Sequence, residues 1–112
     1  MDAKIINDYY DFLKWILLKI AKFPRNFRYT FGERLENLLL NIMELLIEAK
    51  YTKERRSLLQ KANLQLEILR HYIRLSYDIK LVTDKEYEFT SKQLNLIGNQ
   101  LGGWLKGQNN NA

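Results

Sequence analysis

Cations and aromatic rings alternate around the single proline of this 112-residue chain. The segment from residue 19 to residue 29 contains four cations, Lys19, Lys22, Arg25 and Arg28, and three aromatic residues, Phe23, Phe27 and Tyr29. Because cations bind phosphates and aromatic faces stack on bases, this spacing indicates nucleic-acid binding. A second interpretation stays open: the rings of Phe23, Phe27 and Phe31 fill the end of a helical bundle, and only the cations serve as ligands.

A second polar group shares one sector of the helix that we expect between residues 52 and 81. This sector contains Arg56, Asn63, Arg70 and Arg74. At about 100° of rotation per residue, these side chains project in similar directions and can follow a phosphate backbone. The alternative is a solvated surface on which Arg70 pairs with Glu67. The full set of predicted nucleic-acid-binding residues is Lys19, Lys22, Arg25, Arg28, Arg34, Arg55, Arg56, Arg70 and Arg74.

Residues for catalysis or metal binding are scarce. The chain has no cysteine and one histidine, His71, so a di-iron site with two Glu-x-x-His repeats is excluded. It has no glycine-rich phosphate loop and no nucleophile elbow. We therefore predict no enzymatic activity, no catalytic or metal-binding residue and no cofactor, with His71 at the surface or at an interface.

The overall charge agrees with a polyanionic partner. Eighteen Lys and Arg against thirteen Asp and Glu give a net charge of +5. No apolar run approaches the roughly 18 residues that span a membrane. Lys14 and Lys19 also interrupt the one stretch that could act as a signal peptide. We therefore expect a cytoplasmic protein that does not bind membranes.

The elements that position these residues are predicted to be helices. Five glycines and one proline are too few for the turns of a β-sandwich or barrel. Apolar residues instead repeat at helical spacing in four segments. The first segment ends at Pro24, the second runs from between Arg28 and Glu33 to about Lys50, the third starts after a Thr52 N-cap and ends near Leu81, and the fourth opens with a Thr83–Glu86 capping box.

The short connections predict an all-α fold, an antiparallel up-down-up-down four-helix bundle. The bundle is expected to occupy residues 1–107, and residues 108–112 are expected to form a disordered tail. One stripe of each helix should face the core. In the second helix this stripe is Phe31, Leu35, Leu38, Ile42, Leu45 and Ala49, and in the third it is Leu59, Ala62, Leu66, Leu69, Ile73 and Ser76.

The two middle helices each have a second apolar stripe away from the predicted core. A bundle of about 100 residues has no interior position that would bury both sides of a helix. We therefore predict self-association into a homo-oligomer. The predicted interface residues are Leu40, Met43, Ile47, Tyr51, Leu64, Ile68, Tyr72, Leu75 and Ile79.

Three runs of residues resemble the accessory variability determinant (Avd) family of diversity-generating retroelements. They are Asp11-Phe12-Leu13-Lys14-Trp15, the Phe-Pro-Arg segment over residues 23–35, and Gly98-Asn99-Gln100-Leu101-Gly102-Gly103-Trp104-Leu105. The resemblance covers about residues 9–106. It implies a four-helix bundle that assembles as a homopentamer and works beside a reverse transcriptase in mutagenic retrohoming. It also implies binding to that reverse transcriptase and to nucleic acid, namely template RNA, or DNA through its phosphates.

Two alternatives remain open. A related four-helix family, encoded in intervening sequences of large-subunit ribosomal RNA genes, would make the chain a protein-interaction scaffold without nucleic-acid function. That family tends to have a Ser-Ile-Pro-x-Asn-Ile stretch where this chain is leucine-rich, which favours the retroelement branch. The other alternative is a membrane-surface patch formed by Trp15, Leu18, Lys19 and Lys22.

Overall fold

The structure, a computed structural model, describes residues 2–110, with side chains over residues 3–108. All regular secondary structure in this part of the chain is helical, which confirms the predicted all-α class. The helices are α1 (Asp2–Ile20), α2 (Arg25–Arg28), α3 (Phe31–Lys50), α4 (Arg56–Asp78) and α5 (Asp84–Asn110). None of the helices between residues 2 and 110 is both long and apolar enough to span a membrane.

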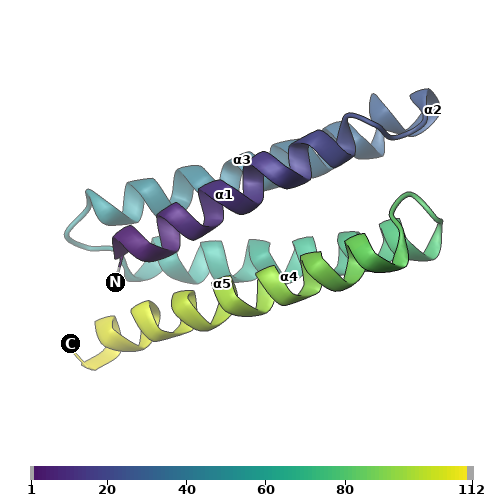
Figure 1. The fold of residues 1–112 in the computed structure, drawn as a ribbon. Helices are drawn as coiled ribbons and strands as arrows, with labels where there is room; N and C mark the ends of the chain where they lie inside the picture. The colour runs from purple at the N-terminus through teal and green to yellow at the C-terminus, as the bar shows by residue number, and fades with distance from the viewer. Residues whose placement is uncertain (1, 111–112) are drawn as a thin grey trace.

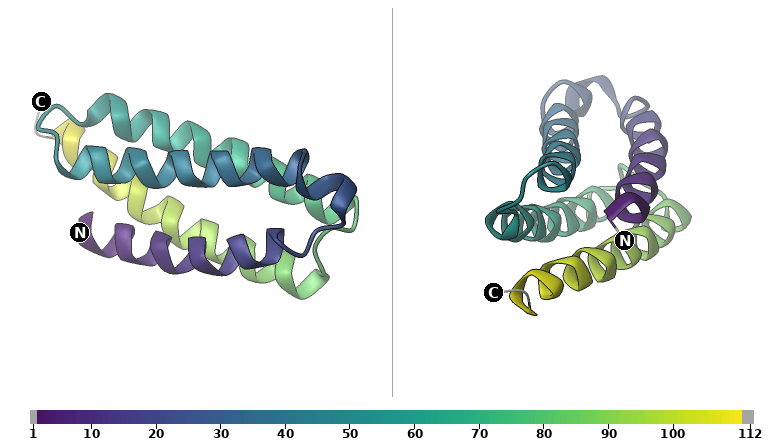
Figure 2. Two further views of the ribbon diagram at one scale, coloured as in Figure 1. Left: turned by 90° about the horizontal axis from the view of Figure 1, so that it is seen from above. Right: turned by 90° about the vertical axis from the view of Figure 1, so that its left-hand side faces the viewer.

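The four long helices lie side by side along an axis of 47 Å, and successive long helices point in opposite directions (Figure 1). Each packs on two others: α1 and α4 both contact α3 and α5. One end of the molecule, here called the α2 end, holds α2 and the α4–α5 connection. The other end, here called the terminal end, holds the start of α1, the end of α5 and the α3–α4 connection (Figures 1 and 2).

The core contains the predicted α4 stripe, most of the predicted α3 stripe and two leucines that the α3 stripe omits. Phe31 and Leu38 of the α3 stripe are only partly buried. The predicted α4 stripe is fully buried, from Leu59 to Ser76. In α3, Leu39 and Leu46 are completely buried as well. The buried arc of α3 is wide because this helix packs on both α1 and α4. The buried Tyr9 hydroxyl of α1 donates a 2.6 Å hydrogen bond to the Leu39 carbonyl, and burial raises the pKa of Tyr9.

Pro24 separates α1 from α2. The α1 helix ends at Ile20, yet Phe23 beyond it is still buried. The Pro24 carbonyl then accepts 2.9 Å hydrogen bonds from the amides of Phe27 and Arg28, which begins α2. Phe23 is thus part of the core, whereas Phe27 is only half-buried. Phe23 therefore contributes to packing and Phe27 in part, whereas Tyr29 is exposed.

The helix ends confirm one predicted cap and contradict another. The Thr83 hydroxyl accepts a 3.1 Å bond from the Glu86 amide, and the Glu86 carboxylate accepts a 2.8 Å bond from the Thr83 amide, as the capping box predicts. Thr52 is not an N-cap: α4 begins four residues later, and Arg55 at the cap position donates from Nε to the Thr52 carbonyl. The predicted Thr52 cap was therefore wrong. The contact between the Arg55 side chain and the Thr52 carbonyl holds the connection between α3 and α4, and α4 begins after it.

The C-terminal ends of α4 and α5 also differ from the sequence-based expectation. The α4 helix ends in a Schellman motif, in which Leu81 N–H donates to the Ser76 carbonyl at 2.8 Å and Lys80 has a φ of 64°. The α5 helix continues to Asn110, so residues 108–110 extend the helix where a tail was expected. Residues 111 and 112 of that expected tail lie outside the described residues.

Candidate nucleic-acid interface

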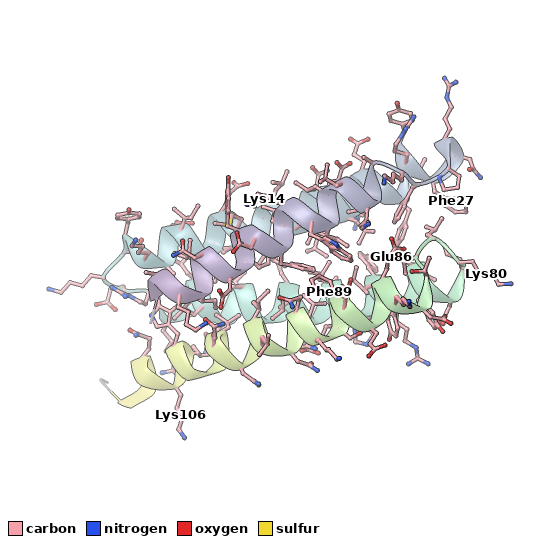
Figure 3. All side chains as sticks on the ribbon, viewed as in Figure 1. Lys14, Phe27, Lys80, Glu86, Phe89 and Lys106 are labelled. Carbon is pink, nitrogen blue, oxygen red and sulfur yellow. The ribbon has the colours of Figure 1, made fainter. Side chains whose placement is uncertain are left out.

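The predicted cationic ligands are divided between the two ends of the molecule. Those of the first basic segment, from Lys19 to Arg34, lie at the α2 end. Arg74 lies one turn before the end of α4 and so belongs to the same end. Arg55 and Arg56 lie at the terminal end, where α4 begins. Figure 3 marks these ends with Phe27 and Lys80 on one side and Lys106 on the other.

Three of the predicted ligands at the α2 end are exposed and form no ion pair within the described residues. They are Lys22, Arg25 and Arg34. Lys19 and Arg28, by contrast, have partners: Lys19 Nζ is 3.7 Å from Glu86 Oε2, and Arg28 Nη1 donates to the Ala21 carbonyl at 3.3 Å. The free cations at this end are therefore the ones best placed to bind phosphate.

The terminal end has a similar charge. Residues 50–61 contain five cations and one acidic residue, Glu54, as residues 19–34 contain five cations and Glu33. Arg55 is held over the Trp104 ring at 5.9 Å and by its bond to Thr52. Arg56 is exposed and forms no ion pair in the described part of the chain. Each end thus has both anchored and free cations.

Arg70 lies between α4 and α5 and is largely occupied by contacts within the chain. Its guanidinium donates to Asn95 Oδ1 at 2.8 Å and to the Leu94 carbonyl at 3.0 Å, and its Nε is 3.0 Å from Glu67 Oε1. Gly98 makes room for this group, because a Cβ there would lie 2.6 Å from Arg70 Nη2. Arg70 therefore joins α4 to α5. Arg74, with 74% of its side chain exposed, has only a 3.8 Å pair with Asp78.

Two tyrosines stack beside these arginines, a feature that we did not predict from the sequence. Tyr77 of α4 and Tyr87 of α5 have ring centroids 4.4 Å apart and an interplanar angle of 12°. The Tyr77 hydroxyl donates a 2.8 Å bond to Asp84 Oδ1, and this bond raises the pKa of Tyr77 above its usual value. The Tyr77 hydroxyl therefore keeps its proton at neutral pH. No pattern within one helix reveals this pair, because the two rings come from different helices.

A hollow of about 230 Å³ adjoins this stack, and we call it the α4–α5 hollow. It is lined by Glu67, Arg70, His71, Arg74 and Tyr87. His71, the single histidine, is exposed, and its Nδ1 is 2.9 Å from the Glu67 carbonyl. Because a carbonyl oxygen only accepts, this contact assigns the proton of the neutral ring to Nδ1 and leaves Nε2 as an acceptor.

The predicted interface residues lie mostly outside the core. Seven of the nine are exposed, including Tyr51 at 78% and Leu64 at 62%, while Met43 and Tyr72 are partly buried against the core. On α4 the exposed members form what we call the apolar edge, which consists of Leu64, Ile68, Leu75 and Ile79. On α3 they form the α3 outer face, which consists of Leu40, Ile47 and Tyr51.

A groove of about 420 Å³ follows the apolar edge where α4 meets α3. Its lining is mixed, with amide, apolar and aromatic side chains: Arg34, Asn37, Leu38, Asn41, Gln65, Ile68 and Tyr72. Such a lining suits another protein surface better than a metal ion. Within the described residues no group of three or more His, Asp or Glu side chains could hold a metal.

Comparison with known proteins identifies the family. No curated protein matches the chain. The family model described as bAvd-like matches residues 4–108, which include the Phe-Pro-Arg segment and the Leu-Gly-Gly-Trp-Leu run. This match confirms the resemblance that those runs indicated. The chain therefore belongs to the bAvd-like family.

Proposed function

We propose that this chain is a non-catalytic accessory protein of a diversity-generating retroelement. In this role four-helix-bundle subunits assemble into a homo-oligomer, a pentamer by resemblance to the family, that binds template RNA and the element's reverse transcriptase and so supports mutagenic retrohoming. The observation that carries the proposal is the family match over residues 4–108.

The distribution of cations supports the RNA-binding part of this proposal. Exposed cations without ion pairs in the described residues lie at both ends, with Lys22 and Arg25 at one and Arg56 at the other. Contacts of this kind bind phosphate without reading sequence. An oligomer repeats them, so weak contacts of single subunits add through multivalency.

The exposed apolar surfaces support assembly. The apolar edge of α4 and the α3 outer face are different surfaces on different helices. A ring with rotational symmetry joins two different surfaces of neighbouring subunits, whereas a two-fold dimer pairs a surface with itself. Two distinct apolar surfaces on one subunit therefore suit a closed ring.

The RNA-binding function is tested by charge reversal at the α2 end. Lys22→Glu with Arg25→Glu should lower affinity for a structured RNA at least tenfold, measured by fluorescence anisotropy at about 50 mM salt, because two phosphate contacts become repulsive. The matched control is Lys92→Glu, an exposed cation on α5 that pairs with Glu88. Equal affinities of the double variant and the control would contradict the proposal.

A second candidate function is that of a protein-interaction scaffold without nucleic-acid function. The apolar edge and the adjoining α3–α4 groove favour it, because a mixed groove of this kind can receive a partner helix. Absence of binding to both RNA and DNA at low salt, together with capture of the reverse transcriptase, would support the scaffold instead.

A further inference from the structure

The stacked tyrosines at the edge between α4 and α5 form a rigid platform. Tyr77 is fixed at its hydroxyl by Asp84, and Tyr87 lies parallel to it at 4.4 Å. Tyr87 also lines the α4–α5 hollow, so it is positioned between the covering Tyr77 ring and an open space. Rings held in place before binding lose little freedom when a ligand stacks on them.

Two arginines around the hollow suit an anion attached to that ligand. Arg70 lines the hollow and is held by Asn95, Leu94 and Glu67, so its positive charge stays in one place. Arg74 extends from the surface, and its 3.8 Å pair with Asp78 is exposed and therefore weak.

The size of the hollow narrows the ligand class. Small-molecule sites usually enclose about 300–1,000 Å³, and this hollow of about 230 Å³ is smaller and open. It therefore suits one unit of a longer chain lying across the surface. Bases in a duplex are stacked on each other and inaccessible to a side-chain ring, whereas unpaired bases stack on tyrosine readily.

We propose that the α4–α5 hollow binds one unpaired nucleotide of an RNA strand, with the base stacked on Tyr87 and the phosphate at Arg74. This inference rests on the proposed RNA-binding function and names the form of RNA that the surface prefers. The protein would then bind single-stranded segments more tightly than duplex of equal length.

The test uses a single-stranded oligoadenylate that contains 2-aminopurine, a base whose fluorescence falls when it stacks on an aromatic ring. Binding of the wild-type chain should quench the fluorescence, and Tyr87→Phe should preserve the quench because it keeps the ring. Tyr87→Leu should remove the quench and lower affinity for the single strand about tenfold, with little change for a matched duplex. Circular dichroism checks that the variant keeps its helices.

Two further variants keep the test decisive. Should Tyr87→Leu unfold, Arg74→Gln alters an exposed side chain and should weaken single-strand binding several-fold. Tyr10→Leu is the control for an exposed ring on α1, with 53% exposure, and should leave the quench intact. A quench that survives Tyr87→Leu in a folded protein, or an unchanged affinity of Arg74→Gln, would overturn the site while leaving the proposed function standing. Failure of the wild type to bind any RNA would overturn both.

Discussion

The two outer edges of α4 differ in chemistry although they belong to one helix. The edge toward α5 presents Arg70, Arg74 and Tyr77. Arg70 and Tyr77 form hydrogen bonds with residues of α5. The edge toward α3 presents the exposed side chains of Leu64 and Ile68, which have no such partners to satisfy. We call the first the polar edge and keep the name apolar edge for the second.

The difference shows which edge is complete within one subunit. On the polar edge, contacts inside the chain hold Arg70 and Tyr77 in place. On the apolar edge, four large side chains stay in water, and burying them would contribute on the order of several kcal/mol. That free energy is comparable with the net stability of a small domain. The apolar edge is therefore where we expect another protein surface to pack.

Loss of assembly is the largest effect that we expect. Ile68→Glu with Leu75→Glu places two carboxylates on the apolar edge, and burying them at an interface would cost far more than the contacts return. Light scattering should show the mass falling from that of an oligomer to that of one chain. Arg74→Glu on the polar edge should leave the mass unchanged. A wild-type chain that is monomeric at high concentration would contradict the comparison itself.

A mixing experiment sharpens this prediction. A chain with Ile68→Glu still has its α3 outer face, and a chain with Leu40→Glu and Ile47→Glu still has its apolar edge. If neighbouring subunits join these two different surfaces, each variant alone should be monomeric and the mixture should form a dimer. Variants that each dimerise on their own would mean that each surface pairs with itself, and a mixture that stays monomeric would contradict the pairing of these two surfaces.

Alanine substitutions at two glycines of α5, one at the polar edge and one on open surface, should differ in their effect on the free energy of unfolding by about 1–2 kcal/mol. A Cβ at Gly102 meets nothing within 4 Å, so Gly102→Ala should raise the free energy of unfolding by about 1 kcal/mol. Gly98→Ala should give no gain, because its Cβ displaces Arg70 Nη2 and weakens the hydrogen bonds to Leu94 and Asn95. Urea denaturation measures both, and equal stabilisation would remove the Arg70 contact from the polar edge.

A substitution at Lys80, just after the end of α4, should change the stability by a somewhat smaller amount. Lys80 has a φ of 64°, a conformation that glycine adopts without strain. Lys80→Gly should therefore stabilise the protein by up to about 1 kcal/mol in a thermal melt. Lys80→Ala removes the same charge but keeps the strained conformation. If alanine stabilises as much as glycine, the gain comes from charge and the backbone argument fails.

The smallest predicted effect is a change of stability in alkali. Because the bond to Asp84 raises the folded-state pKa of Tyr77, its stabilising contribution is fully present below the usual tyrosine pKa of about 10 and is lost as the pH rises through the higher folded value. Tyr77→Phe should thus be less stable than the wild type at neutral pH, and the difference should shrink above about pH 10. A difference that is independent of pH would show that this hydrogen bond does not fix the platform.

Local signals in the sequence predicted local structure well. The capping box at Thr83 and Glu86 needs only residues within one turn, and it formed as predicted. Thr52 carried an equally local signal, but the contacts of Arg55 with Thr52 and Trp104 moved the start of α4. The Schellman motif at the end of α4 was not predicted, because its residue with positive φ is Lys80 and not the glycine that usually marks such a motif.

Contacts between helices could not be predicted from one helix at a time. A helical wheel placed Arg70 with Arg74, although Arg70 turns toward α5 once that helix lies beside it. The same limit hid the stack of Tyr77 and Tyr87, which are ten positions apart and on different helices. The family was recognisable from short runs, since those runs and the match over residues 4–108 coincide. Oligomer formation and nucleic-acid binding stay predictions.

The separation of the two basic ends along a 47 Å axis has a mechanical consequence. If RNA is held at both ends of one subunit, the strand must bridge nearly the whole length of the rod. The protein would then favour transcripts whose accessible stretches are separated by about the length of the subunit, and it would tolerate almost any sequence between them.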